Sequence, residues 1–165
     1  MPVHFTARPF ALVLVVTATL LSGNADESPG LPSVPFDQPG DYEFHFRQPR
    51  RREMTLLLDV VGSSGGETER RKLTHLQTII EVTLINHTGH TVCHAVGSPT
   101  DGMSDTSWVL RAGHKEAAFW HRGCAEIELK RNASYTLKIR IADVDPKTPR
   151  LRLTPILERS DDFGP

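Results

Sequence analysis

The stretch that decides the fold is Ile79–Val96, IIEVTLINHTGHTVCHAV, because it has the pattern of a complete β-hairpin. Apolar and polar residues alternate in its first half, which is the period of a strand with one buried face. Gly89 can adopt a positive φ in the turn, and the side chain of Asn86 can hydrogen-bond the neighbouring backbone. A second strand, rich in β-branched residues, follows the turn. We therefore expect the other strands to be organised around this hairpin.

The chain has two cysteines, Cys93 in the second strand of this hairpin and Cys124 further along. In an exported protein, two cysteines without a Cys-x-x-Cys spacing form a disulfide more often than a redox pair or a metal site. The closed loop of about 30 residues would stabilise the fold by roughly 3–4 kcal/mol. Cys124 falls in register with Glu126 rather than with Ile127, so we expect irregular backbone just before that strand.

The N-terminus has the organisation of a secretory signal. Arg8 precedes an uncharged apolar run over residues 10–21, and small residues follow as far as Ala25. This pattern predicts a signal peptide at residues 1–25, cleaved near Ala25, and a mature protein in the periplasm or outside the cell. The run is shorter than the ~20 residues that span a bilayer, so we expect no stable membrane anchor.

The remainder of the chain predicts an all-β fold. Short alternating segments recur with turn residues between them, and no βα unit is repeated. This favours an antiparallel β-sandwich of eight to nine short strands, with one short helical insert at residues 67–76. Residues 125–130 and 134–144 have the pattern of a second hairpin. The predicted divisions are a signal peptide at 1–25, a Pro-rich linker at 26–40, the sandwich domain at 41–158 and a flexible tail at 159–165.

Charge and motifs exclude several classes of function. The net charge is −1, from 19 basic and 20 acidic residues, which is too even for nucleic-acid binding. The three arginines 50–52 suit either an interaction patch or a solvated turn, and we favour the turn. No Gly-x-Ser-x-Gly or His-Glu-x-x-His motif and no phosphate-binding loop is present. We therefore expect a protein that is not an enzyme and that has no cofactor.

Histidines and tryptophans provide two alternative binding sites. His87, His90 and His94 lie in the central hairpin and could bind Zn²⁺ or Cu²⁺, although exposed histidines are common in turns. Trp108 and Trp120 could stack on sugar rings and so form a carbohydrate- or peptidoglycan-binding module, although tryptophans are more often core residues. Neither alternative can be separated from a purely structural role by sequence.

A third hypothesis is recognition of another protein, and it is the one that we favour. Such a function needs no catalytic residues and uses aromatic and arginine side chains as anchors beside an exposed loop. The loop at residues 97–107 is rich in Ser, Thr, Asp and Gly and fits this role. The candidate partner-binding residues are Trp108, Arg111, Trp120, His121, Asp101 and Asp105.

Four segments in order, GDYEFHF at 40–46, ERRKL at 69–73, VTLIN at 82–86 and ASYTLKI at 133–139, resemble a known pattern. They are similar to those of small exported bacterial β-sandwich envelope proteins of unknown function, with a jelly-roll-like fold. The resemblance implies an envelope binding module. Some such proteins serve as immunity proteins, which neutralise an antibacterial toxin delivered into the envelope. The chain differs from lipoprotein members of that group at Asn24, where they carry a cysteine.

Overall fold

The protein is described from a computed structural model. The described residues are 14–16, 30–48, 50–61, 76–98, 106–110, 117–121, 124–148 and 150–159. Of these, residues 14–16, 59–61, 106–110, 117–121 and 158 are described by their backbone only. The predicted helical insert lies outside the described residues except for Leu76, which is buried and not helical. The predicted tail also lies outside them, except for Arg159.

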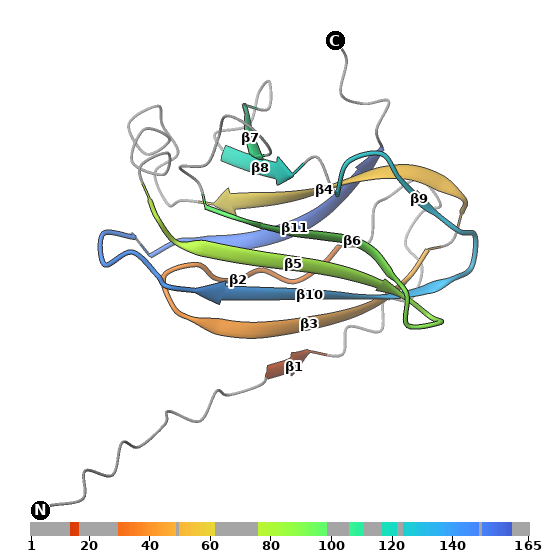
Figure 1. The fold of residues 1–165 in the computed structure, drawn as a ribbon, viewed down its shortest axis with the longest axis horizontal. Coiled ribbons are helices and arrows are strands. Elements are labelled where there is room, and N and C mark those ends of the chain that lie inside the picture. The colour runs from red at the N-terminus through yellow and green to blue at the C-terminus, as the bar shows by residue number, and fades with distance from the viewer. Residues whose placement is uncertain are drawn as a thin grey trace, which may run out of the picture.

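The described strands form two sheets that face each other (Figure 1). Sheet A contains, in spatial order, β1 (Leu14–Val16), β3 (Gly40–Arg47), β10 (Ser134–Ala142), β5 (Ile79–Asn86) and β6 (Thr91–Gly97). Sheet B contains β2 (Val34–Pro35), β11 (Arg152–Arg159), β4 (Arg52–Val61), β8 (Ala117–His121) and β7 (Thr106–Leu110), and β9 (Ile127–Leu129) also pairs with β4. Except for the parallel β1–β3 pair, these pairings are antiparallel. The predicted all-β sandwich is confirmed.

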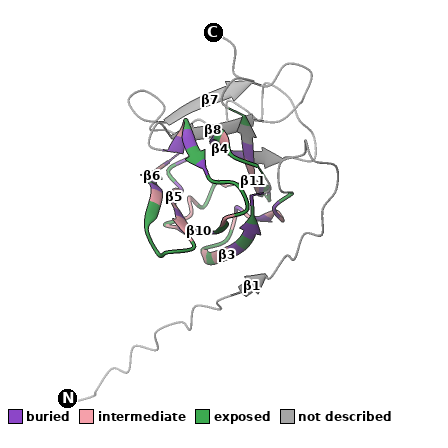
Figure 2. Ribbon diagram, turned by 90° about the vertical axis from the view of Figure 1, so that its right-hand side faces the viewer, coloured by how far each residue is buried: buried purple, intermediate pink, exposed green. Residues whose placement is uncertain are grey.

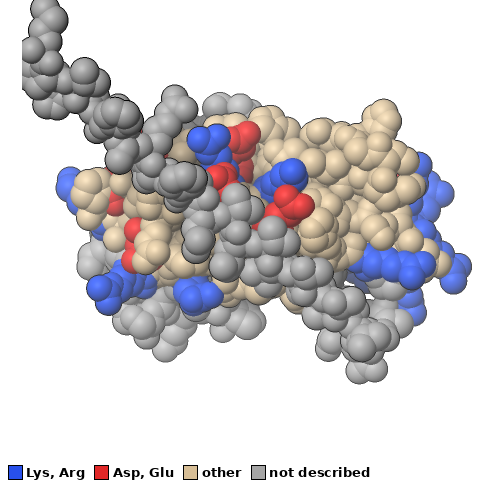
Figure 3. Space-filling view, turned by 90° about the horizontal axis from the view of Figure 1, so that it is seen from below, with Lys and Arg blue, Asp and Glu red and all other residues tan. Residues whose placement is uncertain are grey.

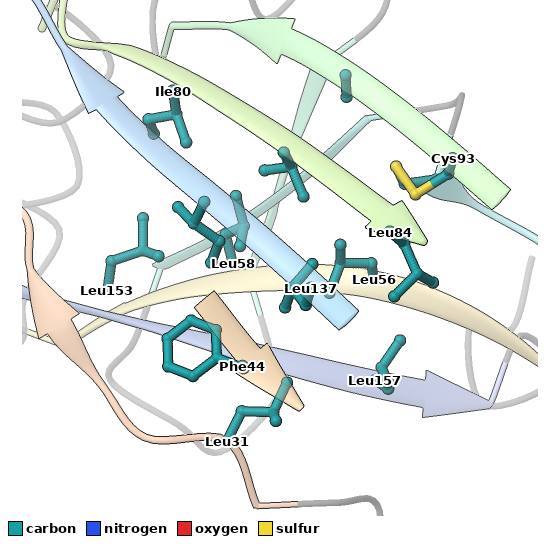
Figure 4. Packing of buried hydrophobic residues seen from close by; sticks show 14 of the residues in the cluster. Leu31, Phe44, Leu56, Leu58, Ile80, Leu84, Cys93, Leu137, Leu153 and Leu157 are labelled. Carbon is teal, nitrogen blue, oxygen red and sulfur yellow. A yellow bond between two sulfur atoms is a disulfide. The ribbon is translucent and has the colours of Figure 1, made fainter. Parts of the chain in front are cut away.

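Side chains from both sheets meet in one core. Phe44 in β3 and Leu137 in β10 are buried between exposed or half-buried neighbours, so these two strands of sheet A turn one face inward. Leu56 and Leu58 of β4 approach from sheet B, as Figure 4 shows. Figure 2 views the same arrangement from one end, where the sheets curve toward each other. Burial of each such side chain contributes about 1.5–3 kcal/mol, so alternation in the sequence drives the sandwich together.

The domain begins earlier than the sequence predicts. Leu31, Val34 and Phe36 lie within the predicted linker, yet all three are buried and Phe36 is fully so. The backbone N–H of Phe36 donates a 3.0 Å hydrogen bond to the carbonyl of Leu151. The prediction of a linker is therefore wrong for residues 31–36. Prolines exclude a central strand but are tolerated at a sheet edge, which is where β2 lies.

Strand β1 falls within the predicted signal peptide. Its three residues pair with Tyr42–Phe44 at the free edge of β3. The sequence predicted eight to nine strands, and β1 and β2 are not among them. Cleavage near Ala25 would remove β1 and leave the antiparallel sheet of β3, β10, β5 and β6 intact.

The central hairpin forms as predicted, with Gly89 and Asn86 in the expected roles. Gly89 adopts a φ of 83°, a conformation that other residues reach only with strain. The N–H of Asn86 donates to the carbonyl of His90 at 2.9 Å and closes the turn. The side-chain Oδ1 of Asn86 accepts hydrogen bonds from the N–H groups of Thr88 and His90, both at 3.0 Å.

The predicted second hairpin does not form. Strand β9 pairs with β4 in sheet B, whereas β10 pairs with β3 and β5 in sheet A. The turn between β9 and β10 contains Asn132 at a φ of 59° and carries the chain from one sheet to the other. Ile127 and Tyr135 are both buried in the common core, although their strands belong to different sheets.

The predicted disulfide joins the two sheets. Cys93 lies in β6 of sheet A and Cys124 just before β9 of sheet B, with their Cα atoms 5.2 Å apart. Both cysteines are buried. The irregular backbone expected before β9 is present, because Glu126 has a φ of 53° and the strand starts only at Ile127. This change of backbone allows Cys124 and Ile127 to be buried together.

Candidate functional site

The outer face of sheet A carries charged side chains of both signs. They occupy the positions that alternate with core residues along β3, β10 and β5. Figure 3, seen from the side on which β3 lies, shows acidic and basic side chains gathered in the middle of the molecule. The residues that form this charged face are Asp41, Glu43, His45, Glu81, Thr83, His94, Lys138 and Arg140.

Charges of opposite sign lie opposite each other across the strands of this face. Lys138 Nζ in β10 is 3.4 Å from Glu43 Oε2 in β3. Within β3, the imidazole Nε2 of His45 also lies 3.2 Å from Glu43 Oε1. Arg140 Nε is 3.8 Å from Asp41 Oδ1. Exposed pairs of this kind contribute about 0–1 kcal/mol each to stability.

A shallow depression of about 360 Å³ lies on the charged face. Its lining includes carboxylates from β3 and β5 and the cations Lys138 and Arg140 from β10. Tyr42 is among the lining residues, but its side chain packs against the core on the inner side of β3. Partial burial, followed by the charge of Asp37, raises the pKa of its hydroxyl. Gly40 leaves room for the ring, because a Cβ there would lie 2.7 Å from the Tyr42 oxygen.

Cations gather at one end of the sandwich, where two connections between strands lie together. One connection joins β3 to β4 and the other joins β9 to β10. Figure 3 shows Lys and Arg side chains along this end, at the right of the view. We call it the basic end, and it consists of Arg47, Arg50, Arg51, Arg52, Lys130 and Arg131. Five of these residues are exposed, and Arg52 is half-buried.

Backbone hydrogen bonds tie the two connections of the basic end together. The N–H of Gln48 donates to the carbonyl of Ala133 at 2.9 Å, and the N–H of Asn132 donates to the carbonyl of Gln48 at 2.6 Å. Arg47 Nε donates to the carbonyl of Asn132 at 3.1 Å. Arg51 forms an ion pair with Glu128 of β9. The two connections that carry the cations are therefore hydrogen-bonded to each other.

The histidines of the central hairpin are all exposed. His87 and His90 lie in the turn, and His94 lies on the charged face with its Nδ1 hydrogen-bonded to Thr83 Oγ1 at 3.0 Å. Within the described ranges, no group of three or more His, Cys, Asp or Glu side chains is placed to hold a metal ion. Metal binding by the three histidines therefore stays a prediction.

The predicted partner-binding residues lie mostly beyond what the structure describes. Trp108 is in β7 opposite Phe119, and Trp120 is in β8 opposite Leu57, so the two tryptophans have opposite parity in the register of sheet B. His121 ends β8. The remaining candidates, Arg111, Asp101 and Asp105, fall outside the described residues.

Sequence analysis missed the charged face, although its signal was present. The alternation along residues 41–47 that buries Phe44 also puts Asp41 and Glu43 on the outer face, and pairing of β3 with β10 brings Lys138 beside them. The fold and these surfaces together define a disulfide-linked β-sandwich with a charged sheet face and a basic end.

Comparison with family models, curated proteins and solved structures gave no match. The resemblance to exported envelope proteins therefore stays a prediction. In the part of the chain that the structure describes, there is no helix with the length and apolar character needed to cross a bilayer.

Proposed function

We propose that this chain is an exported protein-recognition domain without a reaction of its own. In the most specific form, it is an immunity protein or inhibitor that neutralises an antibacterial toxin directed at the cell envelope. The observation that carries the proposal is the charged face of sheet A, where carboxylates and cations alternate across paired strands. A partner would meet this face with a complementary arrangement of charges.

The strand register of sheet A sets the order of charges on the charged face. Lys138 lies opposite Glu43 in the strand register, and Arg140 lies opposite Asp41, so the backbone of the sheet fixes the charge pattern. Charges in a defined order reject partners with the wrong pattern more than they strengthen binding to the right one. High selectivity for one toxin is the property that an immunity protein requires.

Export supports the proposal from two sides. The sequence predicts a signal peptide, and the Cys93–Cys124 disulfide is compatible with an oxidising compartment. A protein that is stabilised in this way can act in the envelope, where a delivered toxin would be met.

A competition experiment in the native host tests the proposed function. A strain that lacks this gene is grown in contact with the parent strain, and its survival is counted. We expect the deletion strain to be killed, and we expect the wild-type gene to restore survival. Survival of the deletion strain beside the parent, under conditions where the parent kills other competitors, would contradict an immunity function.

Charge reversal then tests the role of the charged face. Glu43→Lys or Lys138→Glu in the complementing gene should abolish protection, because each presents the partner with a like charge. Lys147→Glu, in the connection between β10 and β11, is the matched control and should protect fully. A glycan-binding function predicts instead that purified protein is retained on peptidoglycan and that protection is absent in all strains.

A further inference from the structure

The basic end differs in composition from the rest of the molecule. It carries six cationic side chains, while the protein as a whole has a net charge of −1. Among the side chains that the structure describes on β3, β4, β9 and β10 and just before β9, the carboxylates are Asp41, Glu43, Glu53, Glu126 and Glu128. Asp41 and Glu43 belong to the charged face, and Glu128 is paired with Arg51. Positive charge is thus concentrated at one end, and the remainder of the protein is negative on balance.

The geometry of the end presents these cations together. Lys130 and Arg131 lie in the turn between β9 and β10, and Arg50 and Arg51 lie in the connection between β3 and β4. The two connections are joined by the Gln48 and Asn132 backbone hydrogen bonds described above. The cations therefore face a negatively charged surface together, and their electrostatic attractions to it add up.

The kind of partner that the basic end can bind depends on whether apolar side chains lie beside its cations. Protein interfaces are centred on buried aromatic and apolar anchors surrounded by a polar rim. In the described part of the chain, the large hydrophobic side chain that is exposed is Val96, in β6 and not in either connection of the basic end. A layer of anionic lipid headgroups, in contrast, attracts a cluster of cations without any apolar anchor.

We propose that the basic end binds anionic lipid headgroups and holds the domain reversibly at a membrane surface. The attraction is electrostatic, so no side chain enters the hydrocarbon layer. The charged face of sheet A lies along the strands, whereas the basic end lies at their ends. Binding to lipid therefore leaves the charged face open, and the inference does not depend on the function proposed for that face.

Cosedimentation of the purified full chain with vesicles tests this inference. One set of vesicles contains phosphatidylcholine alone, and the other contains two parts phosphatidylcholine to one part phosphatidylglycerol. We expect stronger binding to the anionic vesicles at low ionic strength, and loss of that preference as added salt screens the charges. Comparison with neutral vesicles corrects for any binding by the apolar residues 10–21.

Two double variants with the same loss of charge locate the site. Lys130→Gln with Arg131→Gln should lower the partition coefficient for anionic vesicles, by about fivefold for each charge removed. Lys138→Gln with Arg140→Gln removes two cations from the charged face and should leave it within about twofold of wild type. Circular dichroism spectra that match the wild type show that both variants are folded.

Three outcomes overturn the inference. They are equal binding to neutral and anionic vesicles, insensitivity to salt, and equal losses in the two double variants. If binding to an acidic protein, but not to anionic vesicles, is lost on Lys130→Gln with Arg131→Gln, then the basic end is a protein-binding surface and the lipid assignment is wrong.

Discussion

The hydroxyl of Tyr135 accepts a 2.7 Å hydrogen bond from the backbone N–H of Lys130, across the turn that takes the chain from sheet B to sheet A. The Tyr135 ring is buried and stacks on Phe46, with ring centroids 5.6 Å apart and an interplanar angle of 22°. One side chain therefore anchors the turn to the core. The position of Lys130 and Arg131 at the basic end depends on this anchor.

Replacement of Tyr135 by phenylalanine isolates that hydrogen bond. Phenylalanine keeps the stacked ring but leaves the Lys130 N–H without its acceptor, so we expect a loss of about 0.5–1.5 kcal/mol in the free energy of unfolding. Tyr135→Ala also removes the ring and should cost about 3–5 kcal/mol. Urea denaturation measures both values. Equal losses for the two variants would mean that the ring contributes nothing beyond the hydroxyl.

The disulfide should contribute most of its stability through the unfolded chain. Cys93 and Cys124 are separated by 31 residues, and removing this cross-link should lower the free energy of unfolding by about 3–4 kcal/mol. We expect the double variant Cys93→Ser and Cys124→Ser to unfold at a lower urea concentration than the oxidised protein. Dithiothreitol should lower the midpoint of the wild type and leave that of the double variant unchanged. A wild-type midpoint that dithiothreitol does not shift would show that the link adds no stability.

The Asn86 side chain should be required for the turn of the central hairpin. Its Oδ1 accepts hydrogen bonds from the backbone of Thr88 and His90 and a 2.7 Å bond from the Thr88 hydroxyl. Asn86→Ala removes this acceptor and should cost about 0.5–1.5 kcal/mol in thermal or urea unfolding, because the exposed donors can bond to water instead. Asn86→Asp keeps an acceptor oxygen and is the control, with a smaller expected loss. The prediction fails if alanine is tolerated as well as aspartate.

The positive φ of Gly89 gives a second test of the same turn. Gly89 has a φ of 83°, and no atom lies within 4 Å of the Cβ that an alanine would add. Space therefore does not limit this site, and the cost of Gly89→Ala is the backbone conformation alone, about 1–2 kcal/mol. Gly30→Ala also has open space around the added Cβ but no positive φ. Urea unfolding should show a loss for the first variant and almost none for the second.

Asp145 should make the fold sensitive to acid. Its pKa is lowered chiefly by a hydrogen bond from the backbone N–H of Lys147 and also by one from the N–H of Gln77, while desolvation opposes them. Because the folded-state pKa lies below the unfolded value of 3.8, its contribution to stability is present above that value. The contribution is lost as the pH falls through the folded-state pKa. Asp145→Asn removes the titrating group, so the stability difference from wild type should shrink in strong acid. Acid titrations of unfolding free energy, followed by circular dichroism, measure this, and a constant difference at all pH values would contradict the assignment.

Several features could be predicted from local sequence because they depend on local geometry. Alternation in Tyr42–Phe46 identifies which side chains are buried, since successive residues of a strand point to opposite faces. Gly89 and Asn86 define their turn because their conformational and hydrogen-bonding preferences act within a few residues. The metal hypothesis for His87, His90 and His94 stays a prediction, because a ligand set depends on how side chains meet in space and not on their proximity in sequence.

By itself, the sequence determined the all-β class, the central hairpin and the pairing of Cys93 with Cys124. Only the tertiary structure decided that β9 and β10 belong to different sheets and that Phe36 is a core residue. It also decided that the two arginine- and lysine-bearing connections meet at one end. The physical reason is that every strand offers the same backbone donors and acceptors, so alternation shows which side chains are buried but not which strand lies alongside. That choice is made by packing of the whole core, which joins residues far apart in the chain.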